Sequence, residues 1–507
     1  MSALRLRITM PALAVCLGLA ACGSGQSILQ AGNEPPPPTT AAPSTLPGQT
    51  TVPTLPPTTL PRPIDSLPGC DVEALDIAAA GGPVEIVFWH GLSNELKREL
   101  ERITDEYNSS QDRVRVRLEA QGTYEDNIDK YLQSNTDNRP DLVQLPEYAV
   151  QLMIDTESSV PVQACMEDAG YAAAELLPAA LTAYASESVQ WAMPFNVSNP
   201  VLYYNRKVFR DAGLDDDKPP LTLAEVSAYG QQIQQTGAAS YGISLDSAPD
   251  GGGGWFLEQW LAKEGELYSD NDNGRSAPST RVLFDGPTSV ALLTELQQVV
   301  TTGGGVYVGE NPGGQDHLLK LADATTPAAM TISTSAALGP VLKFVEGGII
   351  PGIGVEDIGI GPMPSPNGAP GALIGGASLW ITAGHGDAKA AAAWEFITHL
   401  VSAAVQSQWA AATGYVPVNS GALALDPLQS VYADDPRFRV AYDQVAQAPD
   451  DPTFAGPVIG PLREVRVTAA AAVGKILSGG DPATALADAA ALATDLIASY
   501  NATRPSN

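Results

Sequence analysis

The chain has 507 residues, of which 44% are hydrophobic and 17% charged, with 27 Lys and Arg against 57 Asp and Glu for a net charge of −30. This length predicts about three domains, and the apolar fraction excludes a wholly disordered chain. Because so acidic a protein repels phosphate backbones and no Lys/Arg cluster offsets the repulsion, no nucleic-acid partner is expected.

The first residues have the pattern of a secretion signal. Arg5 and Arg7 precede an apolar run over 10–21 that is too short to span a bilayer comfortably. The run ends in LAACG at 19–23, which resembles the bacterial lipobox, whose cysteine is acylated after cleavage. We therefore expect residues 1–21 to be removed and Cys22 to anchor the protein on the outer face of the cytoplasmic membrane. An ordinary cleaved signal is the alternative.

Residues 22–66 are predicted to be a linker between this anchor and the folded body. Pro and Thr dominate positions 35–63, a composition that favours extended polyproline backbone and cannot form a core. At about 3.1 Å per residue the segment reaches on the order of 90 Å, enough to cross a thick envelope layer.

Two cysteines, Cys70 and Cys165, belong to the predicted folded body. An even number of cysteines in an oxidising compartment favours one disulfide, and two free thiols are the alternative. Neither CxxC nor zinc-type Cys/His spacing occurs, so no metal site is predicted.

The first half of the folded body alternates between strands and helices. Strands are expected at 84–89, 114–118 and 142–145, and a helix with apolar residues at helical spacing follows the first strand. This order predicts a parallel sheet with ligands beyond the carboxyl ends of its strands. Tyr124 and Glu147 lie just past two of these ends.

The pattern restarts after Pro194 with strands at 201–204 and 241–245. Later apolar segments at 328–333, 358–363 and 372–382 are too few for a third sheet and are expected to complete the first two. The last helix should begin at Pro482 after the N-cap Asp481. Its predicted apolar face consists of Leu486, Ala489, Leu492, Leu496 and Tyr500.

The sequence lacks recognisable catalytic signatures. It contains no HExxH, GxSxG or P-loop pattern, and the DNDNG run at 270–274 departs from a calcium loop at the position of its glycine. No catalytic residue, metal or cofactor is predicted. A secreted hydrolase is the alternative from another class, although no carboxylate pair stands out among the 57 acids.

Seven short segments carry a resemblance to a known family. They are FWH at 88–90, GTYE at 122–125, PFNVS at 194–198, VLYYN at 201–205, AMT at 329–331, IGGASLW at 374–380 and TGY at 413–415. From about residue 84 to residue 500 the chain resembles the solute-binding proteins of bacterial ABC importers, in particular those that bind glycerol 3-phosphate and glycerophosphodiesters.

The resemblance implies a type II periplasmic-binding-protein-like α/β fold with a ligand cleft between two lobes. Lobe 1 would comprise 67–194 and 361–402, and lobe 2 would comprise 195–360 and 403–503. Such a protein is not an enzyme: it would close around a small phosphate-containing ligand and deliver it, as a monomer, to permease subunits in the membrane. A binder of sugars or oligosaccharides is the alternative within this class.

The resemblance also implies eight ligand-binding residues: Tyr124, Glu147, Ser198, Trp255, Thr334, Gly376, Tyr415 and Arg466. Arg466 would bind phosphate with two donors, and Glu147 would accept hydrogen bonds from glycerol hydroxyls. A cation at this place argues against neutral sugars. The alignment at Thr334 could slip to either neighbouring serine, and Arg463 competes with Arg466.

One departure from the family bears on the ligand. Relatives specific for glycerol 3-phosphate carry two tryptophans three residues apart, whereas this chain has Gly252 and Trp255. We expect Gly252 to leave room for a head group and Trp255 to face a quaternary ammonium by cation–π attraction. This favours glycerophosphocholine over glycerol 3-phosphate.

Overall fold

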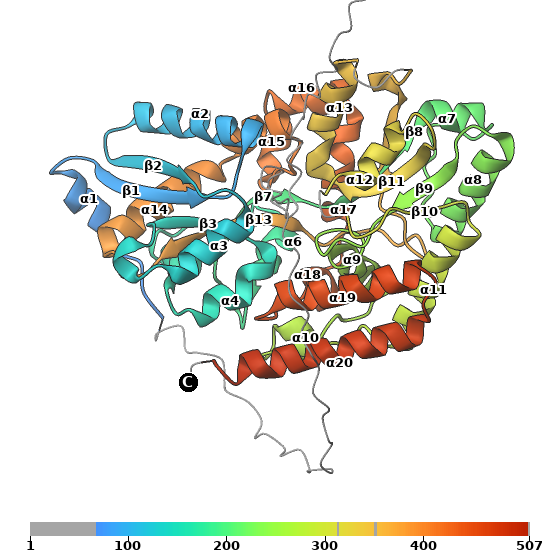
Figure 1. Cartoon of the computed structure of the whole chain (residues 1–507). Coiled ribbons are helices and arrows are strands. Elements are labelled where there is room, and N and C mark those ends of the chain that lie inside the picture. Colours follow the sequence, from blue (N-terminus) through green and yellow to red (C-terminus); the bar gives the residue numbers. More distant parts are fainter. Residues whose placement is uncertain (1–66, 312–313, 349–351, 505–507) are drawn as a thin grey trace, which may run out of the picture.

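The computed structural model describes residues 67–311, 314–348 and 352–504 (Figure 1). The predicted signal, the acylated Cys22 and the Pro/Thr-rich linker lie outside the described residues. Within those described, no helix has both the length and the apolar character needed to cross a membrane.

The first sheet has six strands and contains both early and late segments of the chain. Its strands are β1 (Val84–His90), β2 (Val114–Ala120), β3 (Leu142–Pro146), β4 (Ser159–Val160), β7 (Met193–Ser198) and β13 (Gly375–Thr382). They follow the order β2-β1-β3-β13-β4, and β7 also pairs with β13. The first three strands are parallel, as the alternating pattern predicted, while β13 runs antiparallel to β3. The chain therefore returns to complete its first sheet.

The second sheet has five strands. They are β8 (Pro200–Asn205), β9 (Tyr241–Leu245), β10 (Val306–Tyr307), β11 (Ala328–Thr334) and β12 (Ile358–Pro362). Their order is β10-β9-β11-β8-β12, and β8 is antiparallel to both of its neighbours. Every residue of β7, β8 and β11 is buried, so these three strands lie within the core although they contain Asn, Ser and Thr. A separate hairpin pairs β5 (Ala185–Ser186) with β6 (Val189–Gln190).

Helices flank both sheets, which lie side by side (Figure 1). They are α1 (Ala74–Ala79), α2 (Asn94–Ser110), α3 (Tyr124–Gln133), α4 (Val150–Asp155), α5 (Val162–Asp168), α6 (Pro178–Ala183), α7 (Arg206–Asp211), α8 (Leu223–Thr236), α9 (Trp255–Lys263), α10 (Asp270–Gly274), α11 (Pro287–Thr301), α12 (Asp316–Leu319), α13 (Leu338–Glu346), α14 (Asp387–Leu400), α15 (Ala403–Thr413), α16 (Leu428–Asp434), α17 (Val440–Ala446), α18 (Pro452–Ala455), α19 (Leu462–Leu477) and α20 (Pro482–Asn501). The predicted α/β class is confirmed, whereas the lobe boundaries stay a prediction.

The last helix, α20, confirms its predicted start and corrects its predicted face. Asp481 caps the helix by accepting a hydrogen bond from the backbone N–H of Thr484. The buried side is built mainly from alanines together with Leu486 and Ile497, and Leu492 is 54% exposed. The prediction for Leu492 was wrong because small alanines, which were given little weight, form most of the packed face.

A disulfide joins Cys70, just before α1, to Cys165 in α5. The two cysteines are 95 residues apart in the sequence. The bond ties the beginning of the described chain to the first sheet's surrounding helices.

Candidate functional site

The pairing of β7 with β13 brings two predicted ligand residues next to each other. Gly375 pairs with Ser198, and Gly376 pairs with Val197. At Gly376 φ is +96°, and an added Cβ would lie 2.1 Å from the carbonyl oxygen of Asn196. Only glycine fits so close an approach of two strands, so packing alone already requires this residue.

Tyr124 lies at the start of α3 and is tied to the same strands. Its hydroxyl accepts a hydrogen bond from Asn196 Nδ2 at 2.8 Å, and Asn196 Oδ1 accepts one from Gln144 Nε2 at 2.7 Å. Gln144 lies within β3 and is fully buried. The network ties Tyr124 to β7 directly and to β3 through Asn196.

Thr334 lies beside the first residue of β8, and Tyr415 lies beside β7. Thr334 ends β11 opposite Pro200, and Tyr415 precedes Val416, which bridges to Val197. The Thr334 hydroxyl accepts a hydrogen bond from the backbone of a short turn that follows it. Ser198, Thr334 and Tyr415 are 2%, 6% and 1% exposed, so all three side chains are buried.

Arg466, on α19, is surrounded by carboxylates. Its Nε and Nη2 donate to the two oxygens of Glu258 at 2.7 and 2.8 Å, and its Nη1 donates to Glu147 Oε1 at 2.9 Å. Asp250 Oδ1 lies 3.8 Å from Nη1. We call Arg466 and these three acids the Arg466 cluster. It brings together two predicted residues, Arg466 and Glu147.

Exposure differs sharply among the three acids of the Arg466 cluster. The side chains of Arg466 and Glu258 are each 3% exposed, that of Glu147 is 15% exposed and that of Asp250 is 22% exposed. Burial raises the pKa of Glu147 to about 7, although Arg466 opposes the shift. Burial also raises the pKa of Glu258 against the same opposing charge. The free-energy cost of protonating Glu147 near neutral pH is therefore small.

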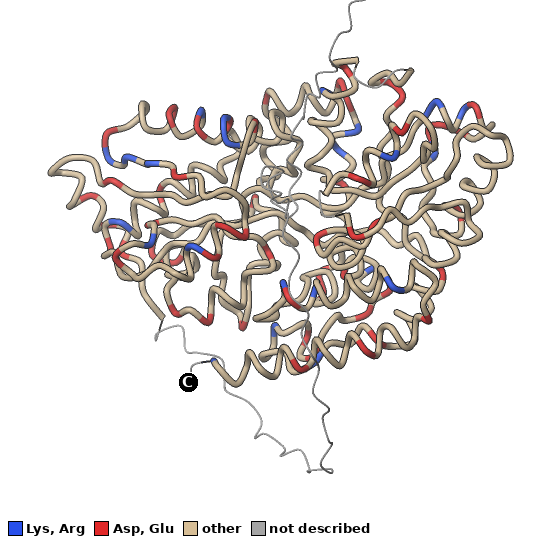
Figure 2. Tube along the Cα trace, in the orientation of Figure 1, with Lys and Arg blue, Asp and Glu red and all other residues tan. Residues whose placement is uncertain are grey.

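Arg466 itself stays charged. Burial alone would lower the pKa of its guanidinium, but Glu258 and Glu147 together raise the pKa well above its ordinary value. Acidic residues are spread over the part of the chain that the structure describes (Figure 2), and the Arg466 cluster places three of them around one buried cation.

Aromatic rings adjoin the Arg466 cluster. The ring centre of Tyr148 lies 5.5 Å from the guanidinium carbon of Arg466, and the Tyr148 hydroxyl donates to Glu125 at 2.5 Å. Trp255, the first residue of α9, is 5% exposed and packs against Gly375, where an added Cβ would lie 2.4 Å from its indole. Trp255 therefore packs the start of α9, the helix that carries Glu258, against β13 where that strand pairs with β7.

The sequence analysis missed Glu258 and Tyr148. A signal for Glu258 was present, because it follows Trp255 by three residues and shares its side of a helix. Tyr148 directly follows the predicted Glu147. Arg463, the alternative to Arg466, is 47% exposed and lies 3.6 Å from Asp129 on α3, away from the Arg466 cluster.

The expectation that Gly252 opens space beside the ligand is wrong. Its N–H donates to Asp246 Oδ1 at 2.8 Å, and an added Cβ would lie 2.2 Å from the carbonyl oxygen of Asp246. The loop folds back on the buried Asp246, so the volume of the missing indole is filled by main chain.

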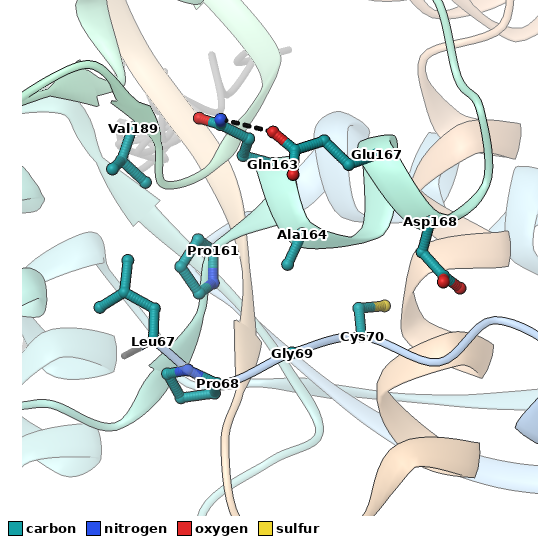
Figure 3. A pocket seen from close by; sticks show the side chains of 10 residues that line it. All are labelled: Leu67, Pro68, Gly69, Cys70, Pro161, Gln163, Ala164, Glu167, Asp168 and Val189. Carbon is teal, nitrogen blue, oxygen red and sulfur yellow. Dashed lines mark hydrogen bonds between the residues drawn. The ribbon is translucent and has the colours of Figure 1, made fainter. Parts of the chain in front are cut away.

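A hollow of about 350 Å³ lies elsewhere in the molecule, beside the disulfide (Figure 3). Its lining residues are Leu67, Pro68, Gly69, Cys70, Pro161, Gln163, Ala164, Glu167, Asp168 and Val189. None of them is a predicted ligand-binding residue.

Known proteins include relatives that are similar to this chain in sequence or in fold. The chain is 28% identical over 407 residues to the sn-glycerol-3-phosphate-binding periplasmic protein UgpB of Pectobacterium atrosepticum, which covers 78% of this chain and 87% of that relative. Its fold is similar to that of UgpB from Mycobacterium tuberculosis in complex with glycerophosphocholine, with a TM-score of 0.65, 21% identity and coverage of 83% and 100%.

A sugar-binding protein has the same fold. The cyclic α-maltosyl-1,6-maltose binding protein from Arthrobacter globiformis gives a TM-score of 0.67 at 21% identity and covers 82% of this chain and 99% of its own. The fold is thus that of the type II solute-binding proteins, as predicted. A model of the bacterial extracellular solute-binding protein family matches residues 102–440, more than half of the 507 residues, and the chain therefore belongs to that family.

Proposed function

We propose that this protein is the substrate-binding component of an ABC importer for glycerol-phosphate compounds, with glycerophosphodiesters such as glycerophosphocholine preferred. The names of the relatives support the compound class, since the Pectobacterium protein is a binder of sn-glycerol 3-phosphate. The observation that carries the proposal is the ion pair between Arg466 and Glu147.

A glycerol phosphate can replace each partner of this ion pair. Its phosphate oxygens can accept from Arg466 Nη1 in place of Glu147, and its hydroxyls can donate to Glu147 in place of the guanidinium. Both protein groups keep hydrogen bonds when the ligand enters between them. A neutral sugar offers hydroxyls but no anion for Arg466.

The charge of the Arg466 cluster favours a diester over a monoester. With all four groups ionised, one cation and three carboxylates leave a net charge of −2. A phosphate monoester has a second pKa of about 6 and approaches two negative charges at neutral pH. Glycerophosphocholine carries one negative and one positive charge, so it suffers less repulsion, and its ammonium can be attracted to Trp255.

The proposed contacts are those of the eight predicted residues, extended by Tyr148. Ligand would enter from the more exposed side of the Arg466 cluster, where Glu147 and Asp250 lie, and closure of the two lobes would bury it.

We assign no catalysis. The proposal includes a monomer that delivers its ligand to permease subunits and is anchored through Cys22, so Cys22→Ala should release it from the membrane fraction. Continued membrane association would remove the anchor from the proposal.

Calorimetry on the purified full chain tests the ligand directly. We expect binding of glycerophosphocholine to be tighter than that of sn-glycerol 3-phosphate, and no binding of maltose or glucose. Binding of sugars alone would overturn the proposal. Enzyme-dependent hydrolysis of glycerophosphocholine or of a glycoside in the same samples would indicate the hydrolase instead.

A sugar is the second candidate ligand, and one observation favours it. Arg466 already has carboxylate partners, so a neutral polyol could bind to Glu147 and Asp250 without displacing an ion pair. The same calorimetric series separates the two candidates, because only the glycerol-phosphate proposal requires Arg466 for affinity.

A further inference from the structure

The two glutamates that hold Arg466 differ in how they hold it. Glu258 contacts the Nε and Nη2 edge of the guanidinium through both oxygens, whereas Glu147 contacts Nη1 through one oxygen. A two-point contact fixes the plane of a guanidinium, which a single contact cannot do. Glu258 is also the more buried of the two, at 3% against 15% exposed.

Glu258 is carried by an element that is itself fixed to Arg466's helix. An added Cβ at Gly253 would lie 2.6 Å from Ala470 Cα, and one at Gly254 would lie 3.1 Å from Arg466 Cβ. The start of α9 therefore touches α19 almost backbone to backbone. Next along α9, Gln259 bonds both the N–H and the carbonyl of Leu373, at 2.9 and 3.0 Å. Glu258 has little freedom to move away from Arg466.

Glu147 has the geometry of a replaceable partner. It begins the short 3-10 turn η3 (Glu147–Ala149) that follows β3, an element separate from the helix α9 that carries Glu258. Its single contact to Nη1 can be given up while the Nε and Nη2 edge stays paired, so an incoming anion would find an oriented donor.

We propose that Glu258 is a positioning residue that permanently fixes Arg466, so that Nη1 alone is exchanged between Glu147 and the phosphate group of the ligand. This rests on the proposed function for the identity of the ligand. Glu258 acts through Arg466, has no contact of its own with the ligand, and determines specificity by presenting one directed donor to an anion.

Two matched substitutions test the proposal. Glu258→Gln and Glu147→Gln each remove one negative charge in hydrogen-bond contact with Arg466 and preserve side-chain shape. By charge alone, both variants should bind glycerophosphocholine more tightly. With Glu258 as the positioning residue, Glu258→Gln should weaken binding by about tenfold to a hundredfold at pH 8, whereas Glu147→Gln, which removes the competitor of the phosphate for Nη1 and keeps an acceptor oxygen for the ligand hydroxyls, should tighten it. Equal or tighter binding by Glu258→Gln overturns the proposal.

Two further variants exclude a merely structural role. Glu258→Asp keeps the charge but is too short for the two-point contact, so it should weaken binding as Glu258→Gln does; wild-type affinity would contradict the proposal.

In an Arg466→Lys background Glu258→Gln should cause no further loss of affinity for glycerophosphocholine, because the effect of Glu258 acts through the guanidinium. An equal cost in both backgrounds would show general destabilisation and overturn the role.

A measurement without ligand separates this inference from the proposed function. Proton exchange of the Arg466 Nε–H, assigned by NMR through its loss in Arg466→Lys, should be slow in the wild type and in Glu147→Gln and fast in Glu258→Gln. Equal exchange rates in all three overturn the positioning role. If the wild type binds no glycerol phosphate, the proposed function fails, and the exchange rates still decide whether Glu258 fixes Arg466.

Discussion

Arg275, which is half-buried, and Arg466, which is buried, lie in two regions of the molecule and pair their guanidinium groups with different kinds of acceptor. Arg275 donates hydrogen bonds to main-chain carbonyls, namely those of Thr182, Ala183, Ala185, Ala455 and Gly456. Arg466 donates to carboxylates. Main-chain carbonyls can neither take up a proton nor rotate away, whereas a carboxylate can do both. Arg275 is therefore a permanent link between residues 182–185 and 455–456, and Arg466 can exchange partners.

The largest effect should come from Arg466→Ala. Truncating one partner of a buried charge pair costs about 2 to 5 kcal/mol, so affinity for glycerophosphocholine should fall roughly thirty-fold to several thousand-fold. Arg463→Ala is the matched control, since Arg463 lies three residues earlier and is 47% exposed. We expect it to alter the calorimetric Kd by less than about threefold. Comparable losses of affinity in the two variants would show that Arg466 has no special role in binding the ligand.

Arg275→Met should affect stability and not binding. The substitution leaves five partly buried carbonyls without this donor, which should lower the free energy of unfolding in urea by about 3 kcal/mol. The folded fraction should bind glycerophosphocholine as the wild type does. Undiminished stability, or a selective loss of affinity, would contradict the role of a permanent link.

The disulfide is a second permanent link and should have an effect of similar size. The double variant Cys70→Ser, Cys165→Ser opens a covalent loop whose ends are 95 residues apart, and should lose about 2 to 4 kcal/mol of unfolding free energy. Urea unfolding of the variant and the unreduced wild type measures the difference. Coincident transitions would show that the bond adds nothing.

The smallest predicted effect is a pH dependence at the exchangeable arginine. Burial raises the pKa of Glu147 to about 7, so this carboxyl is neutral below that pH and becomes charged above it. A charged Glu147 competes with the phosphodiester for Arg466, and affinity should therefore fall about threefold to tenfold as pH rises from about 6 to about 8. Glycerophosphocholine does not titrate in this range. Other groups face Glu147, namely Glu258, Asp250 and Tyr148, so Glu147→Gln is the control: it should bind independently of pH, and an unchanged slope would assign the titration to another group.

The strands were predicted well because burial on both faces leaves a direct trace in the sequence. The strand expected at 241–245 is β9, and that at 142–145 is β3 with one residue added. The late apolar segments were too few to form a third sheet, so they were expected to complete the first two, and β13 does join the first sheet. The strand pattern could not predict the register between β13 and β7, which places Gly376 against Val197.

The eight ligand-binding residues stay a prediction. Arg466 and Glu147 were expected to reach one ligand, and the structure shows them in contact with each other. A role for Glu258 was not expected, because this acid lies in the apolar helix WFLEQWLAK and its partner Arg466 is 208 residues away in the sequence. Gly252 misled for a different physical reason. A glycine leaves room only where no other atoms occupy the place of a side chain, and here the main-chain carbonyl of Asp246 occupies it.

The position of β13 also has a consequence for the order in which the chain can fold. This strand lies between β3 and β4 and pairs with β7, although some 230 residues separate it from β3 in the sequence: Ser378, for example, bonds the carbonyl of Leu145, 233 positions earlier. The first sheet cannot close until residue 382 has been made. Nascent chains shorter than this expose the apolar edges of β3 and β7, so early intermediates should need protection from aggregation while the second sheet is being synthesised.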